Sequence, residues 1–308
     1  MYNALLIHND NTPLKEIIEN KIVFKPTIDD LNSSDLDRYI SNEIIPQVKD
    51  KEFDIIYIKD ALSENYIDFY GLVLAYHIRL SNELKNKKLV PIVILSEINS
   101  HTINKITSLG NILFTKNVFI SENALSTVEK FDHLIPVKLT IEQYKKTFLN
   151  KVEIEAPKDY LSHHSITNEW AIYQWSHLLG VDTEAIQSNR NKINSMLYFK
   201  YLVNKYNLTA RDEIPSEIKL RTGKILLIDD KCEEGWHDVL SGFMGKYYSD
   251  VEFESLGRDF KDIKEIKRIK EQVKNKIETF NPDIVLLDLR LMEEVDSLIN
   301  TDNDKENL

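Results

Sequence analysis

Three aspartates follow apolar runs in the last third of the sequence. Asp229 and Asp230 stand side by side after "KILLI", and Asp288 follows "PDIVLL". Neighbouring carboxylates repel each other and resist leaving water, so a metal ion, a helix N-terminus or open solvent must compensate. Carboxylate oxygens with room for water suit Mg²⁺ or Mn²⁺. A carboxylate beside such an ion can accept a phosphoryl group, because the metal offsets the incoming negative charge.

These carboxylates can act together only if the strands that carry them are neighbours. Over 223–291 short apolar runs alternate with helix-like stretches, and the last of these, 259–280, has an apolar stripe at helical spacing. Such alternation predicts a parallel α/β sheet. Because ligands of doubly wound sheets bind outside the carboxyl ends of the strands, the three carboxylates are expected to converge at one edge.

The sequences "ILLIDD" and "PDIVLLDLRL" together resemble the receiver domain of two-component response regulators. In that family an acidic pair closes the first strand, and the phosphoacceptor aspartate closes the third. The resemblance implies that Asp229 and Asp230 form the pair, with Asp230 a direct metal ligand, and that Asp288 is the acceptor. It further implies that the backbone carbonyl of Arg290 completes the metal site, and that a sensor histidine kinase or another phosphodonor is the partner.

Two positions of the receiver family have no counterpart after Asp288. The family places a Thr or Ser at the end of a fourth strand and a Lys at the end of a fifth, and the remaining residues hold neither strand. An incomplete sheet would leave the Asp288 strand as an exposed edge. We therefore expect the sequence to be a piece of a longer protein, in preference to a receiver that is incomplete by nature.

The first 137 residues resemble a second, degenerate receiver. "ALLIHND" matches "KILLIDD" with Asn9 and Asp10 in place of the acidic pair, and "FDIIYIKD" places Lys59 where Asp288 sits. A lysine cannot form an acyl phosphate, but its ammonium could fill the cation site by pairing with Asp10. Asp60 is one residue further along and is expected to point to the opposite side of the strand.

The later strands of the degenerate copy supply the remaining family positions. "VPIVILSE" puts Ser96 at the hydroxyl position of the fourth strand, and "ILFTK" puts Lys116 at the lysine position of the fifth. The pattern of the fold is complete while the acceptor is missing. This copy is therefore predicted to be a pseudo-receiver that binds protein partners or sets the geometry of a homodimer.

These patterns together predict an α/β protein with a doubly wound parallel sheet, flavodoxin-like and receiver-like, at each end. The predicted domains are 1–137, an all-helical segment at 138–222, and 223–308. Within the helical segment, "SHLLGVDTEAIQSNRNKI" resembles a helix-turn-helix. Its second helix would offer four polar side chains to DNA: Gln187, Asn189, Arg190 and Lys192. A helical spacer or dimer contact is favoured, since the segment is close to neutral in charge.

Composition narrows the function further. The net charge of −11 opposes non-specific binding of nucleic acid, and no apolar run is long enough to span a membrane. The single cysteine, Cys232, fits a reducing compartment, so we expect a cytoplasmic protein. The favoured hypothesis is a signalling protein that is not an enzyme. The alternatives are an unphosphorylated scaffold, a DNA-binding regulator and, more weakly, a phosphatase or nuclease.

Overall fold

The chain forms two compact units that interleave along the sequence. The computed structural model describes residues 2–9, 21–24, 33–63, 65, 67–121, 136–156, 163–208, 222–248, 250–263, 265–288 and 291. Unit 1 comprises 1–161 and 192–209, and unit 2 comprises 162–191 and 210–308. The helical middle segment is thus shared between the units. The domain boundaries expected after 137 and 222 stay predictions.

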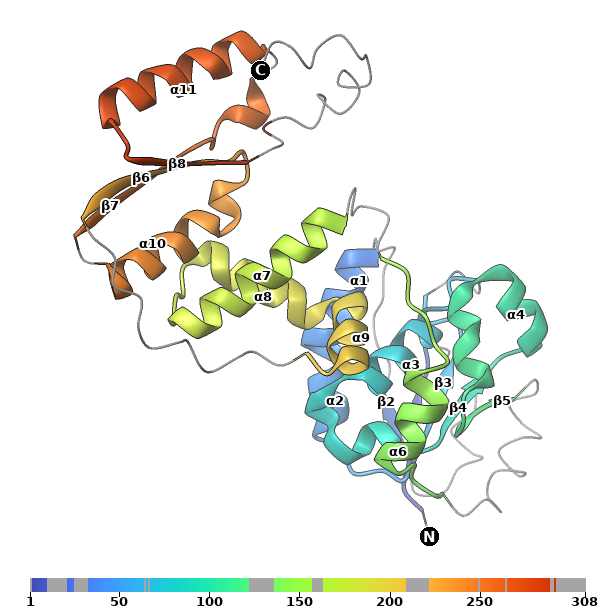
Figure 1. Ribbon diagram of the computed structural model, residues 1–308. Helices are drawn as coiled ribbons and strands as arrows, with labels where there is room; N and C mark the ends of the chain where they lie inside the picture. The colour runs from blue at the N-terminus through green and yellow to red at the C-terminus, as the bar shows by residue number, and fades with distance from the viewer. Residues whose placement is uncertain are drawn as a thin grey trace. The chain divides into compact units, whose positions relative to one another are not determined.

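Unit 1 is built on a five-stranded parallel sheet in the order β2-β1-β3-β4-β5 (Figure 1). The strands are β1 Ala4–Ile7, β2 Lys21–Phe24, β3 Ile55–Lys59, β4 Ile92–Leu95 and β5 Val118–Ser121. Continuous apolar runs such as "IVIL" form them, as expected for a sheet buried on both faces. The strand order reverses at β1, and this reversal confirms the predicted doubly wound fold.

Alternate strand residues of unit 1 pack on opposite faces of the sheet. Leu5, Ile58 and Ile94 share a large core with the helices, whereas Leu6 and Tyr57 belong to a second cluster on the other face. The helices of unit 1 are α1 Ser33–Tyr39, η2 Ile40–Ile44, α2 Ile45–Lys49, α3 Tyr70–Leu80, η3 Asn82–Leu89, α4 Ser100–Ile106, η4 Ser108–Phe114, α6 Ile141–Tyr144, η5 Lys145–Leu149 and α9 Leu197–Tyr206.

Unit 2 is a three-stranded parallel sheet in the order β7-β6-β8. Its strands are β6 Gly223–Ile228, β7 Val251–Leu256 and β8 Ile284–Leu287. Two helices cover opposite faces of this sheet (Figure 1). Leu226 and Ile228 face α11, whereas Ile225 faces α10. The further elements of unit 2 are α7 His163–Leu179, η6 Cys232–Glu234, α10 Trp236–Tyr247, η7 Phe260–Asp262, α11 Ile266–Phe280 and the first part of α8 Glu184–Ser195, which continues into unit 1 at 192.

Helices of the middle segment cover the outer side of α10. Ile172 of α7 and Ile186 of α8 form one apolar cluster with Val239 of α10. The predicted all-helical character of this segment is therefore confirmed in its described part. Among the described residues, no helix is long and apolar enough to cross a membrane.

Candidate metal centre and a sealed receiver site

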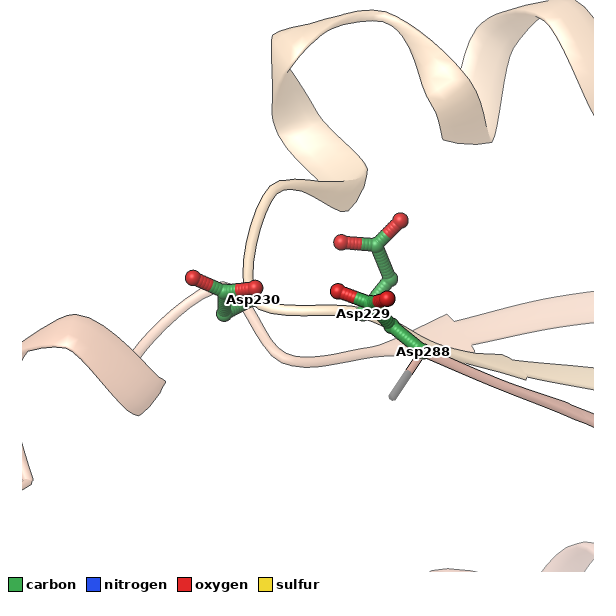
Figure 2. A group of neighbouring side chains, drawn as sticks. All are labelled: Asp229, Asp230 and Asp288. Carbon is green, nitrogen blue, oxygen red and sulfur yellow. The ribbon is translucent and has the colours of Figure 1, made fainter. Parts of the chain in front are cut away.

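Three carboxylates gather at the carboxyl ends of two neighbouring strands in unit 2 (Figure 2). Ile228 of β6 lies opposite Leu287 of β8, so Asp229 and Asp288 leave the sheet at the same level. Asp230 follows directly. One oxygen from each carboxylate lies within 4.8 Å of the other two. This spacing allows one cation to contact all three side chains, which we call the aspartate triad.

Local hydrogen bonds fix the place where β6 ends. The Asp229 carboxylate accepts a hydrogen bond of 2.7 Å from the Lys231 N–H, which turns the chain away from the sheet. On the other side, Gly257 approaches so closely that an added Cβ would lie 2.0 Å from the Asp229 carbonyl oxygen. Gly257 also has a φ of 143°, which side chains disfavour. The backbone under the triad is therefore held from two sides.

Burial and mutual repulsion act together on the triad. Burial raises the pKa of Asp229 and of Asp230, and the charge of Asp288 raises both further. Asp230 is only 6% exposed, and its Oδ1 accepts no hydrogen bond from the described residues. A buried carboxylate oxygen without a donor is costly. These residues fit a hard divalent cation, which would satisfy that oxygen and offset the repulsion. Arg290, the predicted carbonyl ligand, lies outside the described residues.

The sheet of unit 1 carries a buried carboxylate, Asp60, at the corresponding edge. The Asp60 N–H donates to the Leu95 carbonyl, so pairing with β4 continues one residue past β3. Asp60 is 4% exposed, and its two oxygens accept hydrogen bonds from the Ser96 hydroxyl and the Ala61 N–H. Burial raises the pKa of Asp60, and both hydrogen bonds act in the opposite direction. The carboxylate is thus sealed by neighbouring groups.

The structure pairs the predicted residues of unit 1 differently from the expectation. Lys59 lies opposite Leu95 in the register, on the sheet face of Tyr57, whereas Asp60 and Ser96 share the other face. Asp60 does point away from Lys59, as predicted. However, Asp60 and not Lys59 meets the fourth-strand hydroxyl, so the sequence analysis missed the carboxylate at this site.

The other predicted residues of unit 1 do not join Asp60 and Ser96 in one cluster. Lys116 precedes β5, whereas Ser96 follows β4, so the two lie at opposite edges of the parallel sheet. The predicted strand-end position of Lys116 is therefore wrong. Asn9 donates a hydrogen bond of 2.6 Å to the Ser63 carbonyl. Asp10 lies outside the described residues.

Comparison with known protein families finds a match over β2 to β5 of unit 1. A family model described as "Inactive Receiver domain" matches residues 8–121. This part of the chain is an inactive receiver. The comparison identifies no second receiver in the chain. No curated protein and no solved structure matched.

The inactive receiver thus retains a carboxylate at the edge where active receivers carry their acceptor. Asp60 is buried, and both of its oxygens are already hydrogen-bonded. Helix α3 packs closely against the backbone at this edge. The N–H of Gly71 in α3 donates to the Asp60 carbonyl at 2.8 Å, and a Cβ at Gly71 would lie 1.9 Å from the Lys59 oxygen.

Replacing Ser96 by Ala is expected to destabilise the inactive receiver by about 1–3 kcal/mol, because the buried Asp60 carboxylate loses a donor. In the wild type the hydrogen bond from Ser96 lowers the pKa of Asp60, so this pKa rises further when the bond is lost in the variant. A raised carboxyl pKa means that acid stabilises the fold, and the difference from the wild type should therefore shrink as the pH falls. Urea denaturation at about pH 7 and about pH 5 measures both effects.

Ser96→Thr is the matched control, since it keeps the hydroxyl at the same place. We expect it to retain most of the stability. Equal stability of the Ala variant and the wild type at neutral pH would contradict the sealing role of Ser96.

Three of the four side chains proposed for DNA contact are engaged within unit 2 or buried. The Arg190 guanidinium donates to the Asp182 carboxylate at 2.8 Å and to the Val181 carbonyl. Gln187 donates to Asp182 as well, and Asn189 is buried. Lys192 lies one residue after the end of the unit 2 segment. This arrangement favours the structural interpretation of α8 over a recognition helix.

Proposed function

We propose that the protein is a signalling component whose aspartate triad binds Mg²⁺ and whose Asp288 accepts a phosphoryl group. The observation that carries this proposal is the triad itself, in which the buried Oδ1 of Asp230 accepts no hydrogen bond from the described part of the chain. A purely structural carboxylate at such a place would be expected to have a hydrogen-bond partner, as Asp60 has in the other sheet. Mn²⁺ would fit the same ligands.

In this proposal the three aspartates of the triad have different roles. Asp230 and Asp229 would hold the cation, which would offset the negative charge of the transferring group. An Asp288 oxygen attacks phosphorus, a new O–P bond forms, and the bond from phosphorus to the donor's leaving atom breaks. A sensor histidine kinase or another phosphodonor supplies the group. The protein accepts the group and passes on a signal, and is not itself an enzyme; we place it in the cytoplasm.

The inactive receiver serves protein contacts in this proposal, either with other partners or in a homodimer. Its sealed carboxylate supports the role, because Asp60 is occupied by Ser96 and Ala61 and cannot take a phosphoryl group without rearrangement. The same observation favours a second candidate function. If Asp288 of unit 2 does not accept a phosphoryl group either, then the whole chain is an unphosphorylated interaction scaffold.

Incubating the full chain with Mg²⁺ and acetyl phosphate is expected to add one phosphoryl group at Asp288. Intact-mass spectrometry and peptide mapping detect the adduct, and hydroxylamine should remove it because an acyl phosphate is labile to this nucleophile. Asp288→Asn should abolish the adduct, since an amide cannot form it. EDTA should also abolish it, because the triad then lacks its cation.

Asp60→Asn is the matched control, because it removes the sealed carboxylate of the inactive receiver and should leave the adduct unchanged. An adduct that persists in Asp288→Asn would show that another group reacts. The complete absence of an adduct in the wild type, together with saturable Mg²⁺ binding, would support the scaffold function instead.

A further inference from the structure

Helix α9 returns to unit 1 although the chain on both sides of it belongs to unit 2. Unit 1 takes only 192–209 from this part of the sequence. Leu197 and Tyr201 insert into the large core of unit 1, and the Tyr201 hydroxyl donates to the Val152 carbonyl at 3.1 Å. The rest of unit 1 is the continuous segment 1–161, and α9 belongs to a separate segment. Helix α9 could therefore leave the core of unit 1 without a break in that segment.

A buried polar network accompanies this apolar contact. Lys200 of α9 is 8% exposed, and its Nζ donates to the hydroxyls of Ser41 at 2.8 Å and Ser81 at 3.3 Å. The same Nζ lies 3.3 Å from Nδ1 of His77 in α3, which is fully buried. On its other side, His77 Nε2 lies 2.8 Å from the Asp37 carboxylate.

The donors and acceptors of this network permit one protonation state. An ammonium group only donates hydrogen bonds, so His77 Nδ1 must accept from Lys200. Nε2 then carries the ring proton and donates to Asp37, and His77 is neutral. The second Asp37 oxygen accepts from the N–H of Leu197, the first residue of α9, at 2.8 Å. The network therefore connects the start and the middle of α9 to the inactive receiver.

We propose that this network is a proton-sensitive latch, which holds α9 on unit 1 while His77 is neutral and releases α9 when His77 is protonated. A proton on Nδ1 would remove the acceptor of Lys200 and place two cations 3.3 Å apart in a buried site. The Asp37 carboxylate opposes this effect only in part, because it is shared with the Leu197 N–H. The other charged groups near the network are Glu83 and Lys88 of η3.

The direction of the pH effect follows from the states of His77. Burial and the Lys200 charge lower its pKa in the docked protein, whereas released His77 titrates near the ordinary value of about 6.5. Protons therefore bind the released state preferentially, and acidification favours release. Lys200, with a pKa lowered by burial to about 8, is charged in both states below neutral pH and adds no slope there.

Hydrogen–deuterium exchange of 197–206 in the full chain tests the latch. After correction for intrinsic exchange, the opening constant of α9 should rise about tenfold per pH unit below about pH 6.5. His77→Gln should abolish this rise, because its amide can donate to Asp37 and accept from Lys200 but does not titrate. The control His101→Gln removes an exposed histidine of α4 and should keep the full rise.

Two results would overturn the proposal. One is an α9 opening constant that does not change between about pH 7.5 and about pH 5.5 in the wild type. The other is a pH-dependent opening that persists in a folded His77→Gln variant. If that variant fails to fold, the His77 ring is titrated by NMR in the wild type: ordinary titration with α9 still protected refutes the latch, and protonation coincident with α9 release supports it.

Discussion

Replacing Gly257 by Ala is expected to destabilise unit 2 by about 3 kcal/mol or more and to abolish its response to Mg²⁺. The new Cβ would lie 2.0 Å from the Asp229 carbonyl oxygen and 3.1 Å from the Asp230 N. Both neighbours are backbone atoms, which cannot move aside as a side-chain tip could. The φ of 143° adds further strain for any residue with a Cβ. The end of β6 must therefore shift, and the triad with it.

Gly245→Ala is the matched control for this substitution. Gly245 lies in α10, and no described heavy atom outside the local helix backbone and the two neighbouring residues comes within 4 Å of the position that the alanine methyl group would take. Alanine favours a helix over glycine by about 1 kcal/mol, so this variant should be slightly more stable than the wild type. Urea denaturation with and without Mg²⁺ compares the variants. If Gly257→Ala has the stability and the Mg²⁺ response of the wild type, then the close approach of Gly257 is not needed to hold the triad in place.

Asp230→Asn is expected to have two opposite effects. Without metal it should raise the free energy of unfolding by about 1–2 kcal/mol at neutral pH, because it removes a buried charge whose Oδ1 has no donor among the described residues. With metal it should weaken Mg²⁺ binding about 100-fold, because the proposed direct ligand loses its charge. A residue that lowers stability and is needed for binding is typical of a functional site.

The pH dependence of stability gives an independent check on Asp230. Its pKa is raised by burial and by the charge of Asp229, so protonation stabilises the metal-free fold. The stability of unit 2 should therefore increase as the pH falls from neutral through the raised pKa, and this gain ends near the unfolded value of about 3.9. Mg²⁺ should remove the gain, and Asp230→Asn should reduce it.

Asp262→Asn serves as the control for charge alone, since this carboxylate is exposed. It should change neither the Mg²⁺ affinity nor the slope of stability against pH. If Asp230→Asn destabilises the metal-free protein, or binds Mg²⁺ as the wild type does, then the unsatisfied oxygen does not mark a cation site.

The triad was predictable from the sequence because its geometry depends on strand ends. Apolar runs gave the positions of β6 and β8, and parallel strands bring their carboxyl ends to one edge. Asp229 and Asp288 therefore had to meet if these strands paired. The depth of burial of Asp230 was not predictable, since it depends on how the chain continues after the strand.

The predicted site of unit 1 depended on knowing, to within one residue, where the pairing of β3 with β4 ends. Successive strand residues point to opposite faces, so one extra residue of pairing exchanges the side chain that reaches the site. The pairing with β4 continues to Asp60. Asp60, and not the predicted Lys59, therefore lies beside Ser96. Lys116 was misplaced for another reason. The apolar "ILF" before it lies in a 3₁₀ helix, Ser108–Phe114, whereas β5 begins at Val118.

The interleaved order of the two units determines how the protein can be dissected. A fragment ending at 161 keeps the strands of the inactive receiver but lacks α9. It would expose the apolar surface that Leu197 and Tyr201 cover, and it would leave His77 without Lys200. Such a fragment should aggregate more readily than the full chain, and restoring 192–209 as a separate peptide should reduce that aggregation.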